Sequence, residues 1–236
     1  MAENSTDVAA DIAALLKARS HLLWLVTNEE ARVEPFVFEA VASVGYVGVF
    51  WDCGAGVRAL DGRPIEGFSN DLGDTLDAIM ERAQRERTGN DAAPKMCFVM
   101  RDLPPWIGSD LGLLSMMNCR KVKNLARLLP SLPLNRSDAL IVLSPSNKVP
   151  AELANSATVI EWPMPDRKEM GEILDLALQG VPEEMRAVNG TRERAIDAAI
   201  RSDWRTGARV LWTVSRSVEA DRADCDRVRE EAHHRR

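Results

Sequence analysis

The sequence predicts an α/β fold, a three-layer αβα sandwich around a five-stranded, mainly parallel sheet. Five short apolar runs alternate along the chain with longer segments whose apolar residues recur at helical spacing. The runs are apolar at successive positions, as expected of strands that are covered on both faces. Because crossovers between parallel strands are right-handed, the intervening helices are expected on both sides of the sheet.

The predicted elements alternate between helix and strand. Helices are expected over 7–18, 29–44, 74–87, 110–129 and 166–179, and strands over 22–26, 46–51, 96–100, 139–143 and 157–162. Ser109 and Asp166 are the expected N-caps of the last two helices. The glycine-rich segment 52–70 is predicted to be a loop. The periodic pattern weakens after residue 180, which predicts an α/β domain at 1–180 and a less regular remainder at 181–236.

Composition and charge narrow the class of protein. The 236 residues carry a formal net charge of −6, which argues against a general binder of nucleic acid or acidic membranes but leaves a local basic patch open. No apolar run reaches the roughly 18 residues of a membrane helix, and residues 1–7 do not resemble a secretory signal.

His21 is predicted to be a surface or half-buried structural residue. Four cysteines without CxxC spacing are predicted to be buried free thiols in a reducing cytosol, with no metal site: Cys53, Cys97, Cys119 and Cys225.

Three stretches carry a resemblance to a known family. The first, LLKARSHLLWLVTNEE at 15–30, is a helix end, a strand and a polar turn that opens the next helix. The second, CFVMRDL at 97–103, is an apolar strand that ends in an acidic residue. The third begins with IVLSPS at 141–146 and closes with VIEWPMPDRKEM at 159–170. Their order and spacing resemble the core of an AAA+ ATPase over residues 7–180.

Within that class, the chain is similar to the N-terminal, degenerate AAA+ domain of an uncharacterised AAA+ ATPase family found in plastids, cyanobacteria and other bacteria. In that family a second domain with an intact phosphate-binding loop follows. The resemblance therefore implies an AAA+/P-loop-NTPase-like fold without a P-loop of its own. It also implies a cytoplasmic location, no membrane, and a protein partner or an AAA+ ATPase domain as the partner.

The phosphate-binding chemistry is missing where the resemblance implies it. A P-loop, G-x-x-x-x-G-K-[ST], cradles phosphates with backbone N–H groups, a lysine and a helix N-terminus. The chain contains no Gly-Lys dipeptide, and the turn after the first strand holds Thr27, Asn28, Glu29, Glu30 and, shortly after, Arg32. We interpret the two carboxylates as an electrostatic cap on the helix that repels a polyphosphate. Weak nucleotide contact or regulation through Arg32 is the alternative.

Two further AAA+ positions are also degenerate. A Walker B motif carries two acids, one for Mg²⁺ and one that polarises water. The matching positions are Arg101 and Asp102, and Leu103 follows, so the second acid is absent. We interpret Asp102 as a loop or capping residue, and Ser144 and Asn147, near the sensor position, as part of a turn. No catalytic residue, cofactor or metal is therefore expected.

The leading functional hypothesis is a non-catalytic AAA+-like domain, a regulatory or assembly module of a larger AAA+ ATPase. One alternative is a weak ATP-binding or ATPase protein with an unorthodox phosphate site for Mg-ATP. The other is a nucleic-acid-binding module, with a solvated helix face as the competing interpretation. It depends on four cations of the expected helix 110–129: Arg120, Lys121, Lys123 and Arg127.

The last part of the chain differs in kind from the rest. Residues 201–236 are rich in arginine and show poor apolar periodicity. One shifted reading frame can encode Gly-Leu-Thr-Gly-Glu-Gln-Ala in place of 201–209 and Glu-Lys-Lys-Arg-Ile-Ile-Ala in place of 229–236, and both resemble the lid and linker of the family. We therefore expect a truncated product, with a partial lid remnant and a frame shifted near Ala199. A shifted frame that meets a stop codon soon after Ala199 would contradict this.

Overall fold

The computed structural model describes residues 4–88, 93–108, 112–133, 135–178, 192–194, 196–197 and 200. The chain divides into two compact units, Met1–Pro163 and Met164–Arg236. The whole sheet lies in the first unit, and the sequence had placed the division later, after residue 180. The predicted tail at 201–236 and the shifted frame lie outside the described residues.

A six-stranded sheet forms the centre of the first unit, with the strand order β3-β2-β4-β5-β1-β6. Five of the strands run parallel and β3 pairs antiparallel with β2. The predicted α/β class is confirmed, with one strand more than expected. The strands are β1 (Leu22–Val26), β2 (Val47–Asp52), β3 (Gly56–Ala59), β4 (Met96–Arg101), β5 (Ala139–Ser144) and β6 (Thr158–Glu161).

The additional strand lies inside the segment 52–70, which the sequence predicted to be a loop. The side chain of Asp52 accepts hydrogen bonds from the backbone N–H groups of Gly54 and Ala55 at 2.9 and 2.7 Å, which turns the chain sharply. Gly56 then adopts a positive φ of 70°, and the chain returns alongside β2. Glycines allow the sharp turn of this hairpin. They also interrupt the apolar pattern, so the sequence does not predict a strand here.

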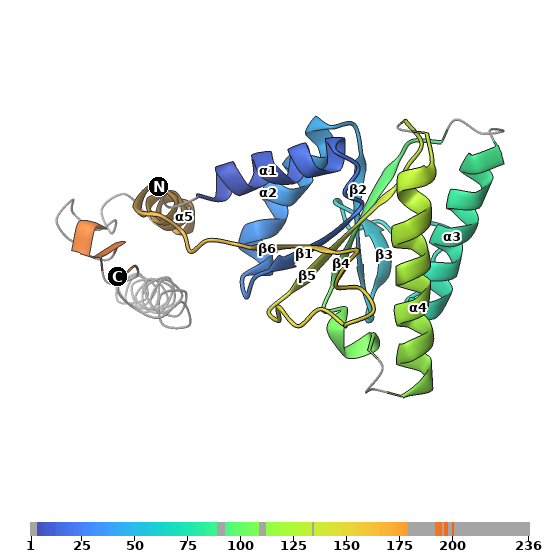
Figure 1. Cartoon of the computed structure of the whole chain (residues 1–236). Helices are drawn as coiled ribbons and strands as arrows, with labels where there is room; N and C mark the ends of the chain where they lie inside the picture. Colours follow the sequence, from blue (N-terminus) through green and yellow to red (C-terminus); the bar gives the residue numbers. More distant parts are fainter. Residues whose placement is uncertain are drawn as a thin grey trace, which may run out of the picture. The chain divides into compact units, whose positions relative to one another are not determined.

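Helices cover both faces of the sheet, as the crossover argument predicts (Figure 1). α1 and α2 lie on one face, and α3 and α4 lie on the other. The second unit contains α5, where Asp166 caps the helix as predicted by accepting a hydrogen bond from the N–H of Glu169 at 2.8 Å. The helices are α1 (Ser5–Lys17), α2 (Glu30–Ser43), α3 (Leu72–Thr88), α4 (Leu113–Leu128) and α5 (Arg167–Ala177), with short 3-10 turns at Pro104–Trp106 and Leu129–Ser131.

Two hydrophobic cores explain why the strands are apolar at successive positions. On β1, Leu23 and Leu25 join the core beneath α1 and α2, whereas Leu22 and Trp24 join the core beneath α3 and α4. The indole N–H of Trp24 is satisfied by the carbonyl of Ser146 at 2.8 Å, so the ring can be buried completely. Neither face of the central strands is available to solvent.

Three predictions about single residues need correction or completion. Cys97 and Cys119 are buried free thiols as predicted, but Cys53 is exposed in the turn after β2. His21 is buried rather than superficial: its Nδ1 lies 2.7 Å from the carbonyl oxygen of Arg19, and burial lowers the pKa of the ring. The predicted N-cap Ser109 lies outside the described residues, as does Cys225.

None of the helices in the described part of the chain combines the length and the apolar character that crossing a bilayer requires.

Strand β2 and helix α2 approach each other closely at Gly48. A β-carbon added to Gly48 would lie 2.5 Å from Cδ1 of Phe38, closer than atoms can pack. Glycine is therefore required by packing and not by backbone conformation at this position.

Replacing Gly48 with alanine is expected to reduce the free energy of unfolding by about 1–3 kcal/mol, because the new methyl group overpacks the core. Chemical denaturation of Gly48→Ala, Phe38→Leu and the double variant measures this. The smaller leucine makes room, so the alanine should cost less in the Phe38→Leu background. An equal cost in both backgrounds would show that contact with Phe38 is not the cause.

Candidate functional site

The carboxyl ends of the parallel strands gather the residues that the sequence singled out. In open α/β sheets, ligands bind at this edge, in the loops that follow the strands. Thr27 follows β1, Arg101 ends β4 and is followed by Asp102, and Ser144 ends β5. The predicted nucleotide positions therefore do lie on one edge of the sheet.

The connection between β1 and α2 is too short to form a phosphate cradle. Only Thr27, Asn28 and Glu29 separate the end of β1 from the first residue of α2. Thr27 is buried; its N–H donates to the carbonyl of Ser144 at 2.9 Å, and its hydroxyl accepts from the N–H of Glu29 at 3.0 Å. A P-loop wraps a phosphate with a run of free backbone N–H groups, and here the run is short and two of its members are occupied.

The acidic start of α2 is anchored to the protein itself. Glu29 occupies the N-cap position but makes no capping hydrogen bond with its side chain. Its carboxylate instead accepts from Nε of Arg32 at 2.7 Å. Arg32 also donates to the hydroxyl of Ser5 at 2.9 Å and to the carbonyl of Pro163 at 2.8 Å. Arg32 thus links α2 to α1 and to the chain after β6.

Arg101, at the end of β4, is held by carboxylates of two other elements. Its guanidinium donates to both carboxylate oxygens of Glu34 on α2, at 2.5 and 2.8 Å. A carboxylate oxygen of Asp52 at the end of β2 lies 3.6 Å away, and the ring of Phe50 stacks 4.1 Å beneath the guanidinium. Asp102 follows in a left-handed conformation, with φ of 48°, and its side chain is exposed.

The charge at this edge is predominantly negative. Burial raises the pKa of Glu30, and the nearby negative charges of Asp102, Glu34 and Asp52 raise it further, while Arg101 opposes them. Four carboxylates therefore surround one guanidinium. This excess of negative charge disfavours binding of a polyphosphate anion. Within the described ranges, no three His, Cys, Asp or Glu side chains come together so as to hold a metal ion.

The sensor-like residues form a turn. The hydroxyl of Ser144 is buried and accepts from the N–H of Ser146 at 3.0 Å, and its carbonyl accepts from Thr27. Asn147 is exposed, and its carbonyl accepts from the N–H of Val149 at 2.9 Å. Ser144 therefore links β5 to the connection after β1 by a hydrogen bond, whereas Asn147 takes no part in that link.

Comparison with known proteins identifies the family of this chain. The family model described as "SpoVK-like AAA ATPase, N-terminal domain" matches residues 8–162. The chain belongs to this family. A curated relative, the uncharacterised AAA domain-containing protein ycf46 of Guillardia theta, is 26% identical over 163 residues, which is 68% of this chain but only 28% of the relative's length.

A solved structure shares the fold of this SpoVK-like N-terminal domain. A chain of the E. coli MS115-1 HORMA:CdnC:Trip13 complex superposes with a TM-score of 0.52 at 10% identity, covering 84% of this chain and 73% of that one. The likeness shows an AAA+-like fold.

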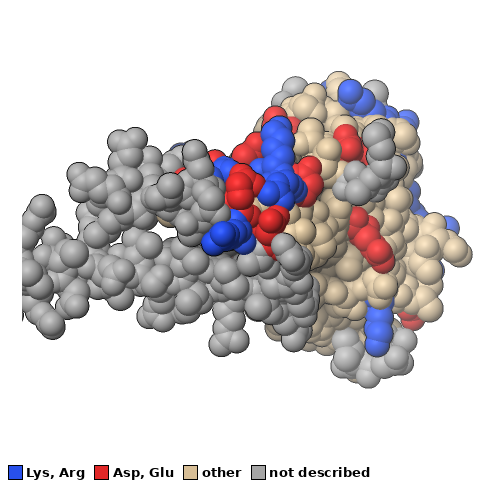
Figure 2. All heavy atoms as spheres, turned by 90° about the vertical axis from the view of Figure 1, so that its left-hand side faces the viewer, with Lys and Arg blue, Asp and Glu red and all other residues tan. Residues whose placement is uncertain are grey.

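The four cations predicted to face nucleic acid do not form one surface in this domain. Nζ of Lys121 donates to the carbonyl of Gly73 at 3.0 Å and to the carboxylate of Asp77 at 2.6 Å, so it faces α3. Arg120, Lys123 and Arg127 share another side of α4 by their helical spacing. Figure 2 turns the side opposite α4 toward the viewer, and both basic and acidic side chains occur on it.

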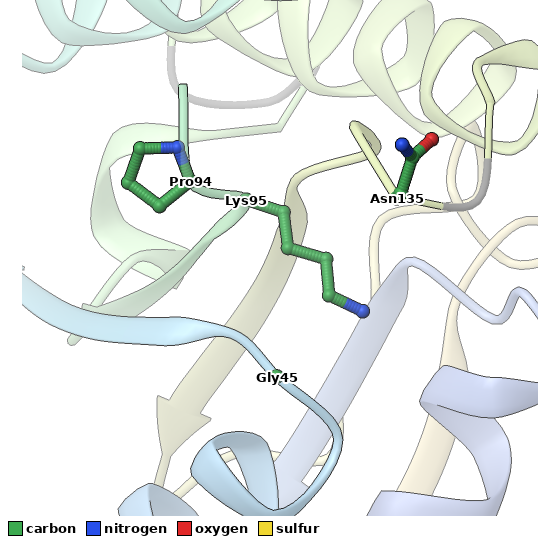
Figure 3. A pocket seen from close by; sticks show the side chains of 4 residues that line it. All are labelled: Gly45, Pro94, Lys95 and Asn135. Carbon is green, nitrogen blue, oxygen red and sulfur yellow. The ribbon is translucent and has the colours of Figure 1, made fainter. Parts of the chain in front are cut away.

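A hollow of about 560 Å³ lies among residues at the amino ends of the strands, and the sequence did not indicate it. Figure 3 shows its lining: Gly45, Pro94, Lys95 and Asn135. The ammonium of Lys95 lies 4.0 Å from the centre of the Tyr46 ring, and burial lowers the pKa of this lysine. One cation and one amide offer no nucleophile with a base beside it, so this hollow is not a candidate for catalysis.

Removing the guanidinium of Arg101 should destabilise the fold, because the carboxylates around it would then repel one another without a compensating positive charge. Arg101→Met is expected to lower the free energy of unfolding by about 1–3 kcal/mol at pH 7. The pKa of Glu30 is raised in the folded state, so the fold favours protonated Glu30. This contribution to stability is fully present below the pKa of Glu30 in the unfolded chain, and it is lost as the pH rises through the pKa of Glu30 in the folded protein. The deficit of the variant should therefore shrink as the pH is lowered toward 4.

The matched control is Arg63→Met, which removes an exposed ion pair with Asp61. Denaturation should show no measurable cost for this variant, because solvent screens an exposed ion pair. Equal costs for the two variants would mean that the Arg101 cluster has no special role in stability.

The chain contains a single tyrosine, which makes burial beside Lys95 measurable. Burial raises the pKa of Tyr46 to about 12. A pH-jump titration of tyrosinate absorbance, read before alkaline unfolding, should show no ionisation near 10, and stability should fall between pH 10 and 12. A midpoint near 10 in the folded protein would contradict the burial of this ring.

Proposed function

We propose that this domain is a non-catalytic regulatory or assembly module of a larger cytoplasmic AAA+ ATPase. The observation that supports this most is the three-residue connection between β1 and α2. The AAA+-like sheet is retained, but the place where nucleotide phosphates would bind has been closed by the protein's own hydrogen bonds. An AAA+ fold that does not bind nucleotide can still present surfaces to other domains.

Electrostatics support the same conclusion independently of the length of the turn. A bound triphosphate needs cations and free N–H donors. At this edge, Arg32 is engaged by Glu29 and Arg101 is engaged by Glu34. Binding ATP would require breaking these ion pairs and bringing a polyanion next to the carboxylates of Glu30 and Asp102. Both costs oppose a weak ATPase using an unorthodox site.

A protein partner is the expected ligand of such a module. The family is described as the N-terminal domain of an AAA ATPase, and the matched stretch spans 28% of the ycf46 protein. The solved relative comes from a complex that is named for three proteins. We propose that this domain contacts an AAA+ ATPase domain or a protein that such an ATPase handles.

Isothermal titration calorimetry of the full chain with Mg-ATP tests the absence of a nucleotide site. We expect no saturable binding of Mg-ATP at nucleotide concentrations up to the millimolar range. A dissociation constant above 1 mM corresponds to a binding free energy weaker than about 4 kcal/mol. A dissociation constant in the micromolar range would overturn the proposal and favour the weak ATP-binding alternative.

The variant Glu29→Gln/Glu30→Gln separates charge from geometry. It removes both negative charges at the start of α2 but leaves the three-residue connection unchanged. We expect the variant not to bind Mg-ATP either, because the turn cannot wrap a phosphate. If neutralisation alone created a nucleotide site, charge and not the short turn would be the decisive feature.

A further inference from the structure

A groove of about 400 Å³ lies beside helix α4. Five of its lining residues come from α4 and one from the connection between β5 and β6. The lining residues are Met116, Met117, Cys119, Arg120, Lys123 and Glu152.

The first turns of α4 expose an unusual amount of apolar surface. Met116 and Met117 are 48% and 49% exposed, and Leu113 and Leu114 just before them are 69% and 63% exposed. Residues three and four apart share one side of a helix, so Leu113 adjoins both methionines. A contiguous exposed apolar surface of this kind marks an interaction site in soluble proteins.

The same side of α4 becomes basic further along the helix. Arg120, Lys123 and Arg127 follow the methionines at helical spacing. In the described part of the chain, none of these three makes an ion pair or a side-chain hydrogen bond, in contrast to Lys121, which is bound to α3. Among the described residues that line the groove, Glu152 is the one with an acidic side chain. The groove thus carries a positive charge on a chain whose net charge is −6.

We propose that this groove binds an acidic amphipathic helix of a partner protein. The apolar side of that helix would cover Met116 and Met117, and its Asp or Glu residues would pair with Arg120 and Lys123. Helices bind grooves through apolar side chains spaced three and four residues apart. Methionine side chains are flexible and polarisable, so they adapt to such a partner. The inference deepens the proposed assembly role, because it assigns a surface and a chemical class to the partner.

The lining favours a helix over a nucleic acid. Single-stranded nucleic acids are held by aromatic side chains set among cations, and none of the described lining residues is aromatic. The exposed apolar side chains of α4 offer nothing to a phosphate; they are Leu113, Leu114, Met116 and Met117. Unpaired cations beside an apolar surface match a ligand that is itself half acidic and half apolar.

The test uses fluorescence anisotropy with the full chain and a labelled synthetic helix of about five turns, which is long enough to be partly helical in water. The probe carries leucines at positions i, i+3, i+4 and i+7, with glutamates on both flanks. The control peptide has lysine in place of every glutamate. We expect saturable binding of the acidic probe that weakens with salt, and binding of the basic control at least about tenfold weaker.

Variants locate the binding surface. Arg120→Glu/Lys123→Glu and Met116→Ser/Met117→Ser should each weaken binding of the acidic probe about tenfold or more. Because all four side chains are at least partly exposed, both variants should keep their far-ultraviolet circular dichroism and melting temperature. Lys17→Glu, an exposed charge reversal on α1 across the sheet, should bind like the unchanged protein.

Several results would overturn the proposal. These are no binding of the acidic probe, equal binding of the basic control, or binding that neither variant weakens while both remain folded. Preferential binding of a single-stranded oligonucleotide that is lost in Arg120→Glu/Lys123→Glu would assign the surface to nucleic acid instead. The outcome is independent of nucleotide binding: micromolar Mg-ATP affinity would end the proposed non-catalytic role, whereas failure here would remove only the partner surface.

Discussion

The three-residue connection between β1 and α2 determines the chemistry of the whole carboxyl edge. The N–H of Thr27, directly after β1, donates to the carbonyl of Ser144 and so continues the ladder between β1 and the neighbouring strand β5. The early start of α2 places Glu34, in its second turn, at the end of β4, where it binds Arg101 through two hydrogen bonds. A longer, glycine-rich loop would separate these groups and leave N–H donors free for a ligand.

We propose that an internal ion-pair network takes the place of a nucleotide at this edge. In an active phosphate site, cations and backbone N–H groups are preorganised and free to bind an anion from solution. In this protein the anions are carboxylates of the chain itself, and they come from α2 and β2. The sheet keeps the AAA+-like architecture. We propose that a partner binds the exposed side of α4.

Much of the scaffold could be predicted because it depends on local patterns. Apolar runs located five strands, and the acidic turn after β1 already indicated that no P-loop is present. The strand β3 was missed, because a hairpin made by Asp52 and glycines has no apolar run. The partners of Arg101 were missed too, since Glu34 precedes it by 67 positions and no local rule pairs them. Likewise, only the packing of α4 on α3 shows that Lys121 is occupied while Lys123 is not.

The most direct test of the closed phosphate site is a crystal structure of the chain grown with a non-hydrolysable Mg-ATP analogue at millimolar concentration. We expect no nucleotide at the turn formed by Thr27, Asn28 and Glu29. We also expect Arg101 to stay bound to Glu34, as in the free protein. Analogue phosphates bound at the start of α2, with Arg101 turned toward them, would show that the phosphate site is open.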